Sequence, residues 1–397
     1  MAVQENLPNK GGKTSRERLA WPDLAKGLSI VGVVLLHITL MVPEGQTGWL
    51  WKFNELVGPL RMPLFFVVSG FFSAKVLNMS LKDLVAKRLW FLLVPYVVWV
   101  SLELWLNRWH FHIVFERPLL SKEELFTALV LGHNMGWFLH ALIIFNLALW
   151  ATKKAPTWLA MILSVIVPLA CLPWHTEYHF VSKALMYLPI FFAGAYFRSF
   201  IARYADALES GPRRGEAWSA FVVSIGLYTL GRSARKAWDE REFETFFEWP
   251  LGNAEWIGDL EVHYFVQSFE QLVKLPAAIA LVVILTKIPG ISAFLQAIGR
   301  NTLPLYLAHP IALTLCVGIP ITLRGIDVTL DGQWPLESTV FWISVGIVAS
   351  VIGGVVLWGV GKLPVIQWLL YPPSIRIRAQ QVKLAADPIN QAPFRNR

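Results

Sequence analysis

Ten apolar stretches of near membrane-spanning length constrain the fold of this 397-residue chain more than any other feature. A hydrocarbon core of about 30 Å takes roughly 20 consecutive helical residues to cross. Lipid offers backbone polar groups no water to bond, so such a segment is a helix. We therefore expect an all-α fold, a polytopic membrane helical bundle of about ten transmembrane helices. The predicted spans are residues 24–43, 56–77, 84–106, 135–151, 157–173, 181–201, 216–231, 263–286, 301–323 and 338–361.

The composition excludes an ordinary soluble protein. Hydrophobic residues make up 55% of the chain and charged residues only 16%, whereas soluble domains carry about 25% charged residues. The two cysteines, Cys171 and Cys316, lie in apolar runs, which favours neither a disulfide framework nor a thiolate metal site. The segment SKEELFTALVLGHN, before the fourth span, is predicted to be a short amphipathic helix at the membrane interface.

The distribution of charge predicts the orientation of the chain. Most of the 35 basic residues fall in segments that are cytoplasmic if the N-terminus is inside, as the positive-inside rule requires. An even number of spans then gives an N-in/C-in protein. We expect a disordered cytoplasmic tail at 1–20 without a cleaved signal peptide, a transmembrane domain at 21–371 and a cytoplasmic tail at 372–397. This topology explains the net charge of +8 without a nucleic-acid partner.

The first span places an acid, a base and a histidine on one side of a helix. Asp23 lies one turn before Lys26, and the eleven residues from Lys26 to His37 turn a helix by about 1100°, within roughly 20° of the same stripe. An imidazole inside a lipid-embedded helix is costly unless it faces protein or water, so His37 is a functional-site candidate. The alternative is that His37 only hydrogen-bonds a neighbouring helix.

The second span contains an arginine within an apolar run. The guanidinium of Arg61 cannot lose its proton, so it needs an anion, a carbonyl or water beside it. The alternative is that Arg61 snorkels to the nearby outer interface. Further along, Ser69 and Gly70 permit close packing of another helix, and Ser69 is a possible site-lining residue.

The remaining histidines give weak support for a metal site. His133 and His140 are seven residues apart, too far to share a metal ion on a straight helix. We therefore expect no metal, with His140 a possible site-lining residue. The histidines of the outer segments are interpreted as solvated loop residues, and one of them could contact an acceptor: His110, His112, His175 and His179.

Other polar residues lie inside the spans. Glu103 lies near the end of the third span. Glu270 and Lys274 are four residues apart, so these two side chains can pair within one helix. In the ninth span, Tyr306 and His309 project one turn apart and are possible site-lining residues.

Four motifs occur in order along the spans. They are D-x-x-K-G-x-x-I-x-x-V-x-x-x-H (Asp23 to His37), R-M-P-L-F-F-V-V-S-G-F (Arg61 to Phe71), W-F-L (Trp137 to Leu139) and G-R-N-T-L-x-L-Y-L-x-H-P (Gly299 to Pro310). Together they resemble the acyltransferase-3 family of integral membrane acyltransferases over about residues 20–370.

The resemblance implies a membrane O-acyltransferase. Such enzymes move an acyl group, usually acetyl from cytosolic acetyl-CoA, onto a hydroxyl of a saccharide, glycolipid or antibiotic. His37 matches the family's central catalytic histidine, and Arg61 matches the arginine of the second motif. Lys26 stands where the family often has arginine, which keeps the charge but loses the bidentate geometry. With Asp23 it is the expected donor-binding site, and Trp137 is a possible site-lining residue.

The chemistry of acyl transfer fits these residue types. Transfer from a thioester to an alcohol needs a base for the hydroxyl and a donor for the developing oxyanion. His37 can be that base or a transient acyl carrier, and Arg61 is a fixed cation for the oxyanion. We expect a bacterial plasma-membrane enzyme acting on an envelope saccharide or glycolipid, such as a trehalose mycolate. The alternative is a transporter or flippase of a lipid-linked saccharide, because intramembrane charges also suit a carrier.

The predicted sidedness can be measured with inserted tags. Tags at residues 5 and 385 are expected in the cytoplasm and a tag near Gly252 outside, because the basic segments are retained inside. Accessibility to an impermeant reagent in intact cells and in lysed cells measures each position. An external C-terminus would show that the number of spans is odd.

Overall fold

The structure is a computed structural model that describes residues 19–171, 184–210, 214–241 and 259–375. Within these ranges the regular elements are helices, with one isolated bridge between Thr329 and Ser338. Six helical segments of the described chain are long and apolar enough to cross a membrane. The all-α class is therefore confirmed, while the count of ten spans and the sidedness of the termini stay predictions. The first three are Ala20–Met41 (α1), Leu60–Asn78 and Leu81–Phe115 (α3 to α5). The second runs from α2 (Trp49–Ser73) into η1 (Ala74–Asn78). The last three are Val262–Leu285, within α13 (Asp259–Leu285), Thr302–Arg324, from α15 (Thr302–Leu313) to α16 (Ile319–Arg324), and Thr339–Val360 (α17).

The third of these segments is longer than the predicted span 84–106. It runs as one helical rod of 35 residues, Leu81–Phe115. It comprises α3 (Leu81–Leu84), η2 (Val85–Leu89), α4 (Trp90–Pro95), η3 (Tyr96–Val100) and α5 (Ser101–Phe115), with π-helical turns at η2 and η3. Pro95, directly before the second π turn, has no N–H to continue the α-helical ladder, which fits a wider turn there.

Of the other four predicted spans, two are short helices, one begins outside the described residues and one lies within a longer helix. The fourth and fifth correspond to α7 (Trp137–Ala151) and α8 (Thr157–Cys171), each 15 residues long. At 1.5 Å per residue such a helix covers only about 22 Å. The sixth, 181–201, begins outside the described residues and continues as α10 (Leu188–Tyr196) and α11 (Arg198–Ser210). The seventh lies within α12, Arg214–Asp239.

Short helices flank the long ones. The short helix predicted before the fourth span is confirmed as α6, Lys122–Leu131, while its place at the membrane interface stays a prediction. It begins with a capping box in which Ser121 and Glu124 each accept the other's backbone N–H. Two further helices were not predicted: α14 (Pro289–Arg300) and α18 (Pro364–Leu370). Each begins with proline in its first turn, where a missing N–H costs nothing.

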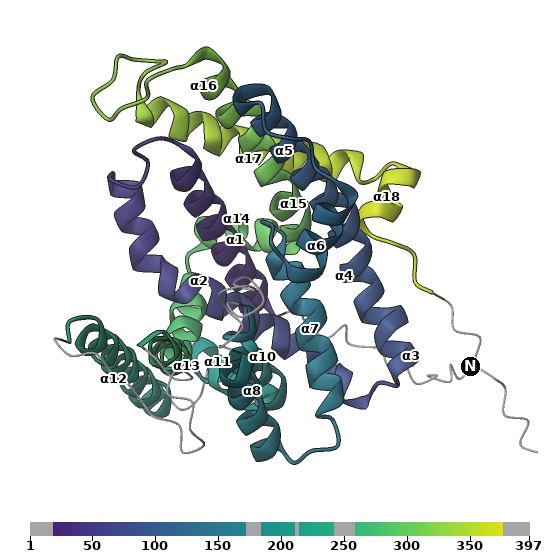
Figure 1. The fold of residues 1–397 in the computed structure, drawn as a ribbon. Coiled ribbons are helices and arrows are strands. Elements are labelled where there is room, and N and C mark those ends of the chain that lie inside the picture. Colours follow the sequence, from purple (N-terminus) through teal and green to yellow (C-terminus); the bar gives the residue numbers. More distant parts are fainter. Residues whose placement is uncertain (1–18, 172–183, 211–213, 242–258, 376–397) are drawn as a thin grey trace, which may run out of the picture.

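α1 lies near the middle of the bundle, with α2 on one side and α15 (Thr302–Leu313) and α17 on the other (Figure 1). Its crossing with α14 depends on two glycines. A Cβ at Gly299 would lie 1.7 Å from the Asp23 carbonyl oxygen, and one at Gly27 would lie 2.0 Å from the Leu295 carbonyl oxygen. The two backbones therefore touch directly, which only small residues allow.

A second crossing of the same kind joins α2 to α10. A Cβ at Gly70 would lie 1.9 Å from the Phe191 carbonyl oxygen, and one at Gly194 would lie 2.1 Å from the Val67 carbonyl oxygen. The close packing predicted at Ser69-Gly70 is therefore confirmed for Gly70.

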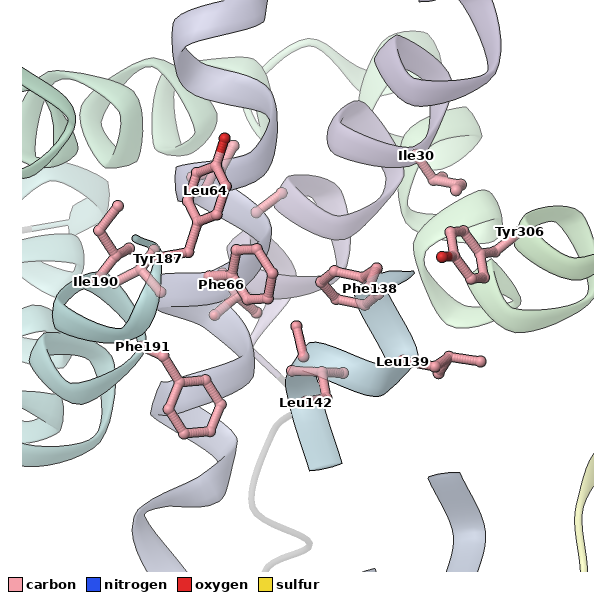
Figure 2. Close-up of a cluster of buried hydrophobic side chains, with 14 of the residues drawn as sticks. Ile30, Leu64, Phe66, Phe138, Leu139, Leu142, Tyr187, Ile190, Phe191 and Tyr306 are labelled. Carbon is pink, nitrogen blue, oxygen red and sulfur yellow. The ribbon is translucent and has the colours of Figure 1, made fainter. Parts of the chain in front are cut away.

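Aromatic side chains fill the space between α2, α7 and α10. Figure 2 shows Phe66 between Phe138 and Tyr187, with Phe191 below. The ring centroid of Phe66 lies 4.9 Å from that of Phe138 and 5.0 Å from that of Tyr187. Phe138 in turn meets Tyr306 of α15 edge-on at 5.8 Å. This cluster links the second helix to the ninth predicted span and supports the site described next.

The α1–α14 crossing can be tested with one methyl group. Gly299→Ala is expected to lower the Tm, because overpacking costs about 1–3 kcal/mol and here the methyl group meets backbone. Gly290→Ala on the same helix is the matched control, since a Cβ there meets nothing within 4 Å. Thermal unfolding of both purified variants in detergent gives the comparison. Equal Tm values would contradict a tight crossing.

Candidate active site

A cavity of about 990 Å³ with polar and apolar lining lies in the half of the bundle near the end of α1. Its walls come from α1, α2, α5, the turn before α7, α7, α12, α13 and α15. Both residues expected to be catalytic, His37 and Arg61, line it, and so do the predicted site-lining residues Trp137 and Tyr306. Residues from the first, second, fourth and ninth predicted spans thus meet in one place.

His37 is hydrogen-bonded to His309, which lies 272 positions further along the chain. Nδ1 of His37 is 2.7 Å from Nε2 of His309. His309 itself is fully buried, and its Nδ1 lies 3.1 Å from the Leu305 carbonyl oxygen of its own helix. The interpretation of His37 as a residue that bonds a neighbouring helix and its interpretation as a site residue are therefore both compatible with the structure.

Arg61 points toward α1. Its Nη1 donates to the Gly32 carbonyl at 3.1 Å, five residues before His37. A Cβ at Gly32 would lie 3.0 Å from Cδ of Arg61, so this glycine gives the arginine stem room against α1. Snorkelling does not describe this side chain, because the guanidinium lines the cavity and bonds a carbonyl inside the protein.

The turn before α7 is fixed by buried polar groups from two other helices. The Tyr306 hydroxyl donates to the Met135 carbonyl at 2.8 Å, and the Glu103 carboxylate accepts the Met135 N–H. Asn134 donates through Nδ2 to the Tyr96 hydroxyl and to the Ala128 carbonyl, both at 3.0 Å. Glu103 and Tyr306 therefore position the wall that carries Trp137.

A polar wall from α12 and α13 was missed by sequence reasoning. Arg232, Arg235 and Asp239 line the cavity although they follow the seventh predicted span, 216–231. Glu270 and Gln271 line it from α13. The predicted pairing of Glu270 with Lys274 is confirmed, and Lys274 is only 1% exposed. The intramembrane charge at Glu270 was the one sequence signal that pointed to this wall.

Four buried polar atoms at this cavity have no hydrogen-bond partner among the described residues. They are Nε of Arg61, Oε2 of Glu103, Oδ1 of Asn134 and Oε1 of Gln271. Buried polar atoms normally have partners, so their convergence on one cavity indicates a polar ligand. One is a donor and three are acceptors.

The expected donor-binding residues lie at the other end of α1. Nζ of Lys26 is 3.0 Å from Oδ1 of Asp23 and 5.7 Å from the centre of the Phe72 ring. Neither Asp23 nor Lys26 is among the described residues that line the cavity, whose lining on α1 begins at Ile30. The structure therefore separates them from His37 along the helix.

Three possible site-lining residues do not line the cavity: Ser69, His140 and His309, of which His309 contacts it through His37. His140 stacks on Tyr96 and packs against Gly132, and neither His140 nor Ser69 is among the residues that line the cavity. His133, seven residues before His140, does line it.

The histidines interpreted as solvated loop residues differ from one another. His110 is a correction: it lies in α5, is 6% exposed and bonds the Thr322 hydroxyl at 2.8 Å, because the helix continues past the predicted end of the third span. His112 is exposed near the end of the same helix and donates to the Arg117 carbonyl at 2.7 Å. His175 and His179 lie outside the described residues. The described chain holds no group of three His, Cys, Asp or Glu side chains that could bind a metal ion.

The comparisons with known proteins agree with the motifs. A family model described as "Acyltransferase domain" matches residues 19–359. No curated protein and no solved structure matches the chain. Because the family model covers well over half of the sequence, including His37, Arg61 and His309, this chain belongs to the acyltransferase-3 family of membrane acyltransferases.

Proposed function

We propose that this protein is an O-acetyltransferase that moves acetyl from acetyl-CoA to a hydroxyl of a cell-envelope saccharide or glycolipid. The observation that carries the proposal is the meeting of His37 and Arg61 in one polar cavity within a chain of this family. An imidazole titrates near neutral pH, and a guanidinium stays charged, so together they supply a base and a fixed cation.

The reaction assigns one role to each group. The acceptor hydroxyl loses its proton to His37 as its oxygen bonds to the acetyl carbon. Arg61 donates hydrogen bonds to the oxygen that becomes negative in the tetrahedral intermediate. The bond from carbon to sulfur then breaks, and the departing thiolate takes the proton from His37 to give CoA. If His37 is acylated first, the acetyl group moves from the thioester to His37 with release of CoA, and then from His37 to the acceptor hydroxyl.

The unpartnered polar atoms support a hydroxyl-rich acceptor. A sugar hydroxyl can donate to the free oxygens of Glu103, Asn134 and Gln271. Trp137 and Phe138 add aromatic rings to the same cavity, which suit the apolar faces of a pyranose. A glycolipid such as a trehalose mycolate is the specific acceptor that we would assay first.

The donor is proposed to approach from the opposite end of α1. Lys26 is partly exposed there and is positioned by Asp23, which suits a phosphate of CoA. Lys26 and His37 are separated by eleven residues, roughly 16 Å along a helix. The long arm of CoA is therefore needed to bring the thioester to His37. We propose a bacterial plasma-membrane location, with cytoplasmic termini and the acceptor on the outer side.

The direct test uses purified protein in liposomes. Labelled acetyl-CoA and an envelope extract are supplied, and the labelled product is identified by mass spectrometry. Label in a saccharide or glycolipid ester supports the proposal. If the thioester is not consumed while a lipid-linked saccharide crosses the bilayer, the protein is a carrier instead.

The role of His37 predicts a large loss of activity. His37→Ala is expected to lower turnover by at least about 10²-fold, as loss of a general base does. His112→Ala is the control, because that histidine is exposed and does not line the cavity. Turnover is compared at matched amounts of folded protein. Activity of His37→Ala equal to the control would remove His37 from the reaction.

The role of Arg61 predicts that lysine cannot replace it. Arg61→Lys keeps the charge but loses the planar donor geometry, so turnover is expected to fall by about 10²–10³, as for loss of an oxyanion donor. Arg117→Lys on the exposed surface is the control. The measurement is turnover at saturating donor and acceptor. A change within about threefold, well short of that range, would make Arg61 a structural residue.

A further inference from the structure

We infer that His309 is a positioning residue that holds His37 in the tautomer with a proton on Nδ1 and none on Nε2, an inference that rests on the proposed function. The evidence is a chain of hydrogen bonds that ends at a backbone carbonyl, from which every proton position follows.

The chain starts on α15. Nδ1 of His309 lies 3.1 Å from the Leu305 carbonyl oxygen, and the imidazole also interacts with the Tyr306 carbonyl. A carbonyl oxygen only accepts, so Nδ1 of His309 carries a proton. The Tyr306 carbonyl is available because the residue four positions later is Pro310, which has no N–H to bond it. The His-Pro sequence therefore provides this acceptor.

The proton on His37 follows from that on His309. Neutral imidazole has one N–H, so Nε2 of His309 is an acceptor. It lies 2.7 Å from Nδ1 of His37, which must then be the donor. Nε2 of His37 is left without a proton, on the residue that lines the cavity. The opposite arrangement needs a charged imidazolium at His309, where burial is complete and charge is costly.

The geometry of the two rings supports a directional bond. Their centroids are 5.0 Å apart and their planes differ by 6°. That separation equals the distance between the two nitrogens plus the radius of each ring, so the rings meet edge to edge. The bond thus lies close to both ring planes, along the nitrogen lone pair. His309 orients the neighbouring imidazole as the third group of a catalytic triad does.

The activity test removes the acceptor and then restores it. His309→Leu is expected to lower kcat by about 10²–10⁴, the range for losing a base or its orienting group, with both KM values within about threefold. His309→Gln is expected to recover at least about tenfold, because its amide can accept from His37 and donate to a carbonyl. His110→Leu is the matched control, a buried histidine that does not line the cavity.

Unchanged kcat in folded His309→Leu would overturn the inference, and so would an equal loss in the glutamine variant. A loss seen in KM alone would overturn it too. Because His309→Leu could fail to fold, the decisive measurement uses the wild type.

That measurement is nitrogen NMR of the wild-type protein, labelled on histidine and reconstituted in lipid, with His37 assigned by comparison with His37→Ala. The expected signature is a protonated Nδ1 and an unprotonated Nε2 on His37. A protonated Nε2 with a bare Nδ1 would overturn the inference. This readout does not depend on turnover. A wild type that binds no acetyl-CoA but shows the signature would contradict only the proposed function.

Discussion

The absence of water from the hydrocarbon core is the constraint on which the rest of this structure depends. A polar group there must find its partner within the protein. Arg61 bonds a carbonyl of α1, Lys274 bonds Glu270, and His37 bonds His309. Each of these contacts joins or stiffens helices that also form the cavity. The hydrogen bonds and ion pairs that satisfy the polar side chains inside the bundle therefore also shape the candidate site.

Close helix crossings give these contacts their geometry. Gly27 and Gly299 let α1 touch α14, and Gly70 and Gly194 let α2 touch α10. α1 carries His37 and α2 carries Arg61. Backbone contact at the crossings therefore holds each of these helices against its neighbour, with no flexible side chain between them. The apolar packing in Figure 2 then continues from α2 through Phe138 to Tyr306. Glycines thus allow close contact between helices, and aromatic side chains fill the wider spaces between them.

The sequence could predict most of the long helices, the family and four residues that line the cavity, because apolar length, intramembrane charge and sequence motifs are local signals: His37, Arg61, Trp137 and Tyr306. It could not predict that His37 contacts His309, because that contact spans 272 positions. Nor could it assign α14, whose apolar residues lie on one face of a short helix, or the wall that Arg232 and Arg235 form. Those arginines lie near the C-terminal end of α12, and only tertiary packing shows that they line the cavity.

The long separation of the paired histidines has a consequence for biosynthesis. His37 enters the membrane early, within the first helix, whereas His309 is translated only after seven of the ten predicted spans have followed. A nascent or truncated chain therefore holds the imidazole without the partner that orients it. The role proposed for His37 therefore requires the completed bundle, because its contact with His309 forms only once α15 is in place.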